Sequence, residues 1–190
     1  MTPDEAAALL ESVGAILRGH FELSSGRHSD VYVQKARVLE QPEPTMALAR
    51  EMASRYRDID VVVAPAVGAI ALGFAVALAA GARSMFTERD GGRMALRRGF
   101  EIRPGERALV VEDVITTGGS AGEVFDLLGE MHAERLGVAA MVDRSSALLP
   151  FPLQAVLRLE AVSWPSDQCP LCAAGRMIES PGSRHLPGSG

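Results

Sequence analysis

The sequence predicts an α/β domain in which a central parallel sheet is flanked by helices on both faces. Short apolar, β-branched runs alternate with helical segments, and this alternation is typical of parallel strands joined by crossover helices. The chain has 190 residues, of which 47% are hydrophobic and 23% charged. This composition supports one well-packed core and excludes disorder as the default state. The formal net charge of −5 does not favour nucleic acid or an anionic membrane as a partner.

The expected elements follow one another along the chain. Thr2, Pro3 and Glu5 form the pattern of a capped helix start, and this helix is expected to run to about Leu17, since Gly19 can end it. The other expected helices cover residues 44–56, 68–80 and 121–131. The expected strands cover residues 21–23, 31–33, 60–64, 108–111, 136–142 and 155–159.

The uncharged stretch Val61–Ala82 is long enough to cross a bilayer. Pro65 and Gly68 divide it into a β-branched run and an alanine-rich run, which favours a buried strand, a tight loop and a buried helix. The N-terminus carries Asp4 and Glu5 where a signal peptide would need basic residues and then an apolar run. We therefore expect a cytoplasmic protein without a membrane partner.

The chain is expected to form a single domain over residues 1–165 and a tail over residues 166–190. Proline, glycine and serine are frequent in the tail, so it is expected to be extended or partly mobile. Residues 86–104 are expected to form a flexible hood hairpin, because turn signals flank it and seven arginines lie within residues 83–107. The alternative for these residues is a solvated, charged hairpin without a functional role.

The segment Val110–Gly122, VVEDVITTGGSAG, carries the clearest chemical signal. An apolar strand leads to Glu112 and Asp113, then to a turn over Thr116–Ser120, and then to a helix. The glycines let backbone N–H groups approach a phosphate, the hydroxyls add donors, and the helix start adds the positive end of its dipole. Because the two carboxylates can accept hydrogen bonds from sugar hydroxyls, the segment predicts a ribose-phosphate site. The alternative is that both acids are capping or surface residues.

Two competing interpretations of this segment are disfavoured. A Walker A loop needs a lysine after its glycines, and the only lysine of the chain is Lys35. Residues Gly118–Gly122 match the Gly-x-Ser-x-Gly nucleophile elbow, but Glu112–Thr117 separate the serine from its strand. The later histidines do not complete a triad, since His132 falls in an expected helix and His185 in the tail.

Cys169 and Cys172 have the spacing of half a zinc ribbon. The chain has no second cysteine pair, although His185 could add one ligand and a two-fold partner could add two cysteines. Because ligands are missing, the favoured alternative is a pair of reduced thiols in a turn.

Four segments match the motifs of one protein family. They are Phe21–Tyr32 (FELSSGRHSDVY), Ala64–Ile70, Glu112–Ser120 and Met141–Arg144. In this order they resemble the N-terminal segment, the pyrophosphate loop, the signature that binds 5-phosphoribosyl 1-diphosphate (PRPP), and the strand that ends in an orotate-binding arginine. The family is that of the type I phosphoribosyltransferases, and the first and last motifs resemble the orotate phosphoribosyltransferases in particular. The resemblance covers residues 21–159.

The resemblance implies a central parallel sheet flanked by helices, with a flexible hood hairpin and a small N-terminal lobe. It also implies the site residues: Arg144 would pair with the orotate carboxylate, Thr116 would contact orotate, and Ser25 and Gly26 would line the base pocket. The implied PRPP-binding residues are Glu112, Asp113, Val114, Ile115, Thr116, Thr117, Gly118, Gly119 and Ser120. Mg²⁺ would travel with the pyrophosphate, bound mainly by substrate oxygens and water.

Lysines that this family carries in the N-terminal segment, the pyrophosphate loop and the hood are absent here. Ser24 and Gly68 stand at the first two places, and Lys35 lies outside the hood. The resemblance therefore implies that Arg97 and Arg98 of the hood supply the positive charge that meets the leaving pyrophosphate. Two alternatives stay open: a non-catalytic, PRPP-sensing transcriptional regulator of the same fold, and a transferase for another nucleobase.

The activity implied by the resemblance is transfer of the 5-phosphoribosyl group from PRPP to orotate, which gives orotidine 5′-phosphate and diphosphate in de novo pyrimidine biosynthesis. Catalysis would rest on Glu112, Asp113, Arg97 and Arg98, because the transition state should resemble an oxocarbenium ion with a departing pyrophosphate. The expected partners are the two small-molecule substrates and a second copy of the chain in a homodimer.

Overall fold

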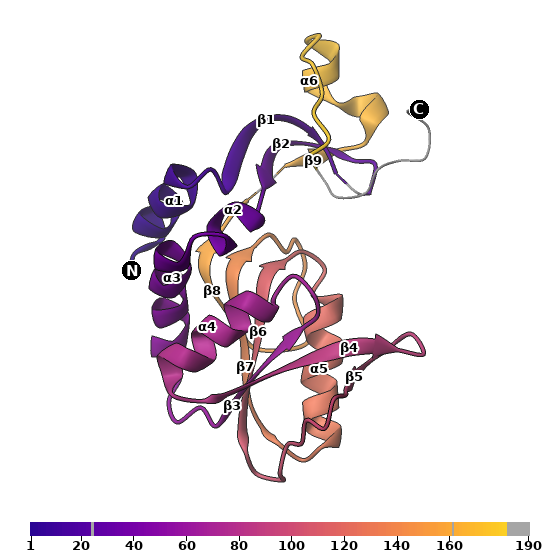
Figure 1. The fold of residues 1–190 in the computed structure, drawn as a ribbon. Coiled ribbons are helices and arrows are strands. Elements are labelled where there is room, and N and C mark those ends of the chain that lie inside the picture. The colour runs from indigo at the N-terminus through magenta and orange to yellow at the C-terminus, as the bar shows by residue number, and fades with distance from the viewer. Residues whose placement is uncertain (24, 161, 182–190) are drawn as a thin grey trace.

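The computed structural model describes residues 1–23, 25–160 and 162–181. These residues form a large six-stranded sheet covered by helices and a small three-stranded sheet that lies beyond one end of it (Figure 1). The large sheet has the strand order β5-β4-β3-β6-β7-β8, and every neighbouring pair is parallel except the β4–β5 hairpin. Its strands are β3 (Val61–Pro65), β4 (Arg83–Asp90), β5 (Arg93–Leu96), β6 (Arg107–Ile115), β7 (Glu134–Asp143) and β8 (Leu153–Arg158). The predicted α/β fold with a parallel sheet is confirmed.

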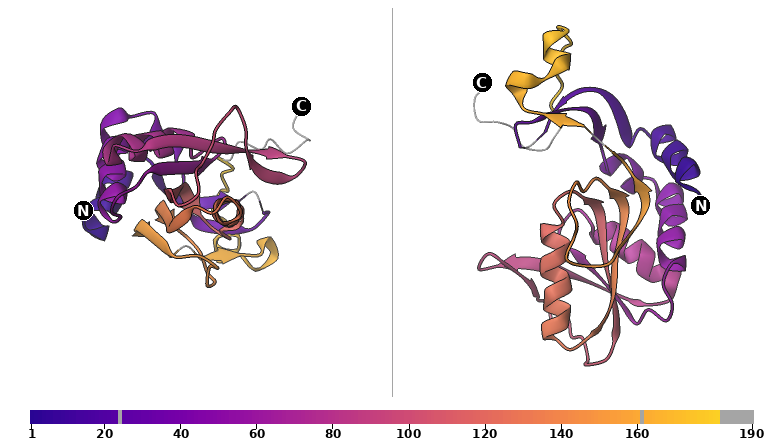
Figure 2. Two further views of the ribbon diagram at one scale, coloured as in Figure 1. Left: turned by 90° about the horizontal axis from the view of Figure 1, so that it is seen from below. Right: turned by 180° about the vertical axis from the view of Figure 1, so that it is seen from behind.

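Helices cover both faces of the large sheet (Figure 2). The helices α3 (Pro42–Ser54) and α4 (Ile70–Ala80) pack against each other on one face, and α5 (Gly119–Glu130) packs on the other. The helix α1 (Pro3–Ser12) contacts β8, and the short α2 (Ala36–Leu39), which the sequence did not indicate, precedes α3.

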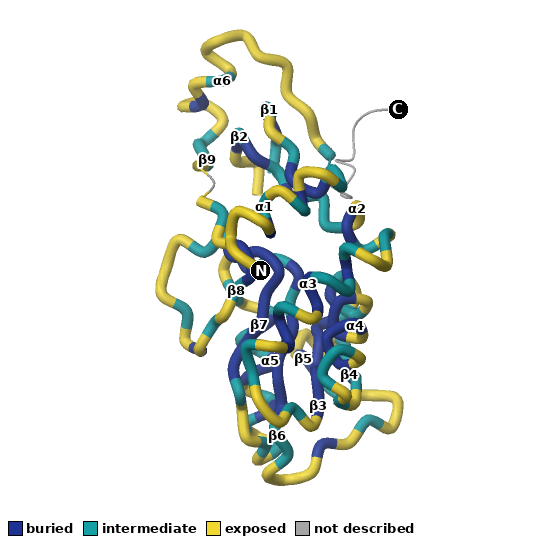
Figure 3. The backbone as a smooth tube through the Cα atoms, turned by 90° about the vertical axis from the view of Figure 1, so that its left-hand side faces the viewer, coloured by how far each residue is buried: buried dark blue, intermediate teal, exposed yellow. Residues whose placement is uncertain are grey.

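Successive side chains of the buried strands point to opposite faces of the large sheet, and each face has its own apolar cluster. In β3, Val62 packs in the cluster under α3 and α4, whereas Val61 and Val63 pack in the cluster under α5. All three are fully buried, and Figure 3 shows the same burial along β6 and β7. The stretch Val61–Ala82 is thus a strand, a loop and a helix, as predicted, and none of the helices in the described ranges is long and apolar enough to cross a bilayer.

The small sheet is built from both ends of the chain. The strands β1 (Ile16–Glu22) and β2 (His28–Val33) form a hairpin, and β9 (Ser163–Trp164) pairs with β2. The expected extension of the first helix to Leu17 is wrong. The helix ends at Ser12 because Gly14 adopts a left-handed conformation, with φ of +70°, and the chain from Ile16 onward pairs with β2.

The tail is more ordered than the sequence indicated. After β9 it forms a 3₁₀ turn (Ser166–Gln168) and the short helix α6 (Pro170–Ala173), and it then returns along β1, where Glu179 pairs with Phe21. The expectation of an extended tail is therefore wrong for this part of the chain. His185 lies outside the described residues.

Candidate active site

The carboxyl ends of β3, β6 and β7 meet at the edge of the large sheet that faces the small sheet. Ile115 at the end of β6 lies beside Asp143 at the end of β7, and the loop after β3 begins at Ala66 on the same edge. Ligands of open parallel sheets bind at this edge, because the loops that follow the strands converge there. The predicted site residues on these three loops are therefore brought together.

The turn between β6 and α5 forms a cradle of about 80 Å³. Gly118 adopts φ of +75°, and a Cβ at this position would lie 2.8 Å from Leu149 Cδ2 and 3.0 Å from Phe151 Cζ. The turn therefore requires glycine both for its conformation and for space. The cradle is lined by Glu112 and by Val114, Ile115, Thr116, Thr117, Gly118, Gly119, Ser120 and Ala121, so it contains eight of the nine predicted PRPP-binding residues.

The first turn of α5 offers backbone donors to an anion. The N-cap residue Gly118 has no side chain to cap this twelve-residue helix, and the Gly119 N–H donates one hydrogen bond of 3.5 Å to the Thr117 hydroxyl. The following N–H groups and the positive end of the dipole therefore face the cradle. Ser120 is the second residue of the helix rather than the residue that follows the strand, and His132 follows the helix with φ of +58° instead of lying inside it. The nucleophile-elbow interpretation therefore lacks its geometry.

The acidic pair belongs to the last part of β6, which is longer than the predicted strand. Asp113 is only 2% exposed, and its Oδ1 accepts a hydrogen bond of 2.7 Å from the Val114 N–H. The Glu112 Oε1 accepts a bond of 3.0 Å from the Asp113 N–H. Burial, together with the neighbouring charge of Asp113, raises the pKa of Glu112 to about 8. The protonated form of Glu112 is therefore favoured at pH 7, and a neighbouring cation would favour the ionised form.

Lys35 reaches this pair from the small sheet. It follows β2, and its Nζ lies 2.6 Å from Asp113 Oδ2 in an ion pair. The lysine side chain is 43% exposed, whereas the aspartate side chain is 3% exposed. A second pocket of about 330 Å³ opens here, next to the cradle, with which it shares three residues. Its lining residues are Lys35, Pro65, Ala66, Val67, Gly68, Glu112, Asp113, Val114 and Ser120.

Gly68 explains how the lysine fits into this pocket. A Cβ added at Gly68 would collide with the Lys35 Nζ and would lie 2.8 Å from Asp113 Oδ2. The amine of Lys35 therefore occupies the space beside residue 68. The family that the sequence resembles carries a lysine at this position of the pyrophosphate loop. A lysine from another segment brings a positive charge to the same place.

Arg144 lies at the end of β7, next to the small sheet. Its backbone N–H donates to the Ile115 carbonyl at 2.8 Å, and its Nη2 donates to the Val31 carbonyl of β2 at 3.5 Å. Burial lowers the pKa of Arg144, while the charges of Asp30 and Tyr32 oppose this shift. The Oδ1 of Asp30 is buried and accepts no hydrogen bond from the described residues. The end of β7 therefore offers the Arg144 guanidinium to a ligand, and β2 offers a buried carboxylate oxygen of Asp30 that has no hydrogen-bond partner among the described residues.

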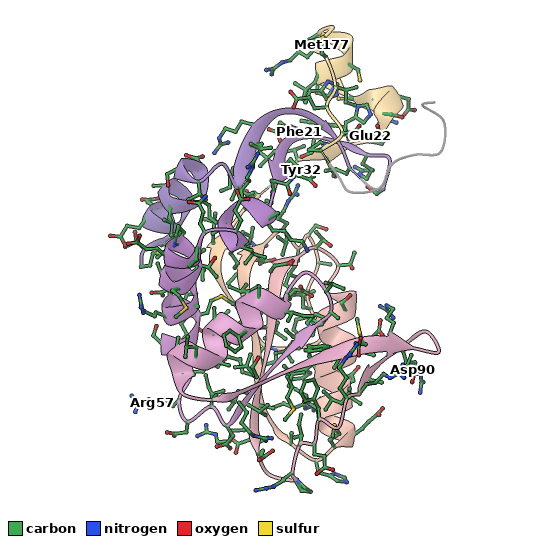
Figure 4. All side chains as sticks on the ribbon, viewed as in Figure 1. Phe21, Glu22, Tyr32, Arg57, Asp90 and Met177 are labelled. Carbon is green, nitrogen blue, oxygen red and sulfur yellow. The ribbon has the colours of Figure 1, made fainter. Side chains whose placement is uncertain are left out.

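The remaining predicted residues lie outside the two pockets. Ser25 and Gly26 are exposed in the turn between β1 and β2, where the Gly26 N–H donates to Leu23. Arg98 donates two hydrogen bonds of 2.8 Å to Glu88, and Arg97 lies 3.7 Å from Asp90. Figure 4 shows Asp90 near the tip of the β4–β5 hairpin, which projects to one side of the large sheet. Arg97 and Arg98 are therefore engaged with acidic residues of β4.

Comparisons with known proteins agree with this geometry. Residues 35–152 match the family model of the phosphoribosyl transferase domain. The chain is 43% identical over 190 residues to the orotate phosphoribosyltransferase of Caldanaerobacter subterraneus and 46% identical over 190 residues to that of Pelotomaculum thermopropionicum, with 98% of this chain and 100% of the relative covered in both. The chain belongs to the orotate phosphoribosyltransferase family. The solved orotate phosphoribosyltransferase of Aeropyrum pernix has a TM-score of 0.68 at 25% identity, over 81% of this chain and 93% of that one.

Sequence reasoning assigned no role to two residues of this orotate phosphoribosyltransferase-like site, Lys35 and Asp30. The signal for Lys35 was present, since it is the only lysine of the chain, but its partner lies 78 positions further on, at Asp113. Asp30 lies in the segment Phe21–Tyr32, which resembles the family motif, but no feature of the sequence marks it as a site residue among the other residues of that segment. The three-stranded sheet and the described residues 165–181 that follow it form a small lobe. Cys169 and Cys172 lie in this small lobe, outside the lining of both pockets and beside two histidines.

Proposed function

We propose that this protein transfers the 5-phosphoribosyl group from PRPP to N1 of orotate and so forms orotidine 5′-phosphate and diphosphate, a step of de novo pyrimidine biosynthesis. One observation carries the proposal: the cradle at Thr116–Ser120, the acidic pair and Arg144 lie together at one edge of the sheet. A phosphate, a ribose and an anionic base would each meet groups of complementary chemistry there. The relatives of nearly full length carry the same activity in their names.

The ribose phosphate would bind along the end of β6. The first N–H groups of α5 and the hydroxyls of Thr116, Thr117 and Ser120 would hold the 5′-phosphate. Glu112 and Asp113 would accept hydrogen bonds from the ribose hydroxyls, and their negative charge would stabilise an oxocarbenium-like transition state. The C1–O bond to diphosphate breaks as the bond from C1 to the ring nitrogen forms.

The base would bind between Arg144 and the small sheet. The planar guanidinium suits a carboxylate, which distinguishes orotate from the uncharged pyrimidines. We assign to the unpaired oxygen of Asp30 a hydrogen bond from the ring N–H of the base, since a buried acceptor is costly when it lacks a partner. Thr116, Ser25 and Gly26 remain proposed contacts of the base.

Lys35 is the best-placed cation for the diphosphate end of PRPP, because it lines the pocket formed by the loop after β3. Arg97 and Arg98 are proposed to join it when the hood closes, which requires Arg98 to leave Glu88. The carboxylates of Glu112 and Asp113 are oxygen donors of the kind that Mg²⁺ accepts, and Mg²⁺ bound mainly by the diphosphate would neutralise the leaving group. The described lining of the two pockets includes no histidine or cysteine, so positioning and charge would carry the catalysis.

A homodimer and a cytoplasmic location also belong to this proposal. The helix α4 exposes Phe74 and Leu78 by 61% and 63%, and these residues lie one turn apart on one face of the helix. Two large, exposed apolar side chains that are neighbours on one helix face favour burial of that face against a second copy of the chain. Light scattering should give the mass of two chains, and Phe74→Glu should give a monomer. A wild-type monomer would contradict the dimer.

The activity is tested by replacing the acidic pair. Asp113→Asn keeps the shape and removes the charge, and we expect it to lower kcat/KM for PRPP by about tenfold to a thousandfold. Asp126→Asn on α5 is the matched control, because this aspartate is 79% exposed and far from the cradle. Both variants should fold normally. If Asp113→Asn and Glu112→Gln both retain normal turnover, the acids are structural and the proposed site is wrong.

A further inference from the structure

The small lobe brings four metal-ligating side chains to one point. His20 lies in β1, His28 begins β2, and Cys169 and Cys172 flank the start of α6. One ligand atom from each residue lies within 4.8 Å of all the others. The pairing of β1 with β2 and of β2 with β9 produces this meeting, because His28 pairs with Glu22 on one side and with Trp164 on the other.

The spacing of the ligand atoms is that of a tetrahedral metal site. The His20 Nε2 lies 3.1 Å from the His28 Nδ1, 3.5 Å from the Cys169 Sγ and 3.7 Å from the Cys172 Sγ, and the Cys172 Sγ lies 3.3 Å from the His28 Nδ1. Zinc bonds of about 2.05 Å to nitrogen and 2.3 Å to sulfur give tetrahedral edges of about 3.3 Å between nitrogens and about 3.6 Å between nitrogen and sulfur. Four of the six distances therefore match the edges of a tetrahedral zinc site, and the other two are no longer than 4.8 Å.

Hydrogen bonding alone accounts poorly for this arrangement. The Nδ1 of His20 lies 2.9 Å from the Arg176 carbonyl, which can only accept, so this nitrogen is the N–H donor and the Nε2 is left as the atom that can bind a metal. The Nε2 then has one lone pair and three close neighbours, which a single hydrogen bond cannot satisfy. One cation at the centre satisfies all four groups, and the contact with Arg176 would fix the histidine as second-sphere partners of zinc ligands do.

The C-terminal segment of the lobe contributes almost nothing to an apolar core. Of the described residues 162–181, Cys169 alone is buried, with 3% exposure, and Figure 3 shows the chain around α6 largely exposed. His20 and His28, with 2% and 7% exposure, are buried on the facing side. A segment that buries so little apolar surface needs another source of stability, and structural metals serve small modules in this way.

We propose that His20, His28, Cys169 and Cys172 bind one Zn²⁺ per chain in a closed, structural site. Two thiolates and two neutral imidazoles give a neutral complex, which suits a site with three buried ligands and one exposed ligand, Cys172. Four protein ligands leave no place for a substrate. The missing ligands that disfavoured zinc on the sequence are thus supplied by the β1–β2 hairpin of the same chain. The site would fix β2, whose Val31 carbonyl accepts the hydrogen bond from Arg144.

The metal content of the full chain tests the proposal. The protein should be expressed without a histidine tag, purified without chelator and measured by elemental analysis, and we expect about one zinc per chain. Cys172→Ser and His28→Gln should each lose the metal. His132→Asn is the matched control, because His132 is exposed outside the lobe and asparagine tolerates its positive φ. One zinc per two chains, or full zinc content in Cys172→Ser, would overturn the site.

A second measurement covers variants that fail to fold. The wild-type chain, freed of metal under reducing conditions, should take up one equivalent of Co²⁺ and show the thiolate charge-transfer bands and the strong visible bands of a tetrahedral S₂N₂ site. The exposed thiol of Cys172 should react with a thiol reagent in the metal-free protein and be protected after addition of zinc. Absence of cobalt binding by reduced, folded protein, or a disulfide between Cys169 and Cys172 in protein purified with reductant, would refute the proposal.

Discussion

Substitution of Gly118 by alanine perturbs the phosphate cradle in two separable ways. The left-handed conformation costs an alanine about 1–2 kcal/mol. The added Cβ would lie 2.8 Å from Leu149 Cδ2 and 3.0 Å from Phe151 Cζ, and overpacking of this kind costs about 1–3 kcal/mol. Together these effects predict a loss of about 2–5 kcal/mol in the free energy of unfolding, which the midpoint and slope of urea denaturation measure.

Gly105→Ala is the matched control for Gly118→Ala. Gly105 has φ of +81° and no atom within 4 Å of its Cβ position, and it precedes β6 at the opposite end of the sheet. It should show only the conformational cost of about 1–2 kcal/mol.

Ligand binding separates the two variants further. A shift of the cradle that removes one hydrogen bond to the phosphate should weaken ribose 5-phosphate by about tenfold to a hundredfold, since bonds to charged groups contribute about 1.5–3 kcal/mol. Calorimetric titration measures this loss, and Gly105→Ala should bind normally. If the two variants match in stability and in ribose 5-phosphate affinity, the assignment of the cradle is refuted.

The remaining predictions concern charged side chains of the site. Lys35→Met should lower kcat/KM for PRPP by about tenfold to a hundredfold in steady-state assays, because it removes the cation beside Asp113 and the diphosphate. Arg144→Ala should weaken orotate by a similar factor in calorimetry while PRPP binding is retained, because only the carboxylate loses its partner. Burial raises the pKa of Glu112 from 4.5 to about 8, so the native state holds the extra proton between these values and the free energy of unfolding should fall as pH rises through this window. Glu112→Gln should remove that fall in urea denaturation at several pH values. Arg98→Ala should reduce turnover with little change in Tm, because its contacts are exposed.

Matched controls decide these predictions. Arg37→Met accompanies Lys35→Met, since Arg37 is a 62% exposed neighbour that pairs with Glu40. Equal kinetics for these two variants would remove Lys35 from the site. Loss of PRPP affinity in Arg144→Ala equal to the loss of orotate affinity would contradict its assignment. A pH dependence that is unchanged in Glu112→Gln would show that another group titrates.

The cradle could be predicted from the sequence because its signals are local. Turn glycines, hydroxyls and a helix start follow one another between Thr116 and Ser120, and the strand before them fixes their place at the edge of a parallel sheet. Arg144 is singled out by the family resemblance of residues 141–144, and it follows a buried strand in the structure. Gly118 shows the limit of such reasoning, because the contacts with Leu149 and Phe151 that exclude a side chain come from a distant loop.

The contacts between the small lobe and the large sheet could not be predicted in this way. Lys35 meets Asp113, and Cys169 meets His20 across 149 positions, and no local pattern encodes such pairings. The end of the first helix was misplaced because Gly19 looked like its stop, whereas the turn at Gly14 and the pairing of Ile16 with Val33 end it earlier. Tertiary pairing overrides local propensity at such boundaries.

The most direct test of the central claim is a competition among bases. The purified chain, Mg²⁺ and PRPP are mixed with orotate, uracil, adenine and hypoxanthine together, and the nucleotide products are separated and quantified with the diphosphate released. The account predicts orotidine 5′-phosphate as the main nucleotide, formed in equal amount with diphosphate, and loss of that preference in Arg144→Ala. A protein that binds PRPP but forms no nucleotide, or one that prefers an uncharged base, would contradict it.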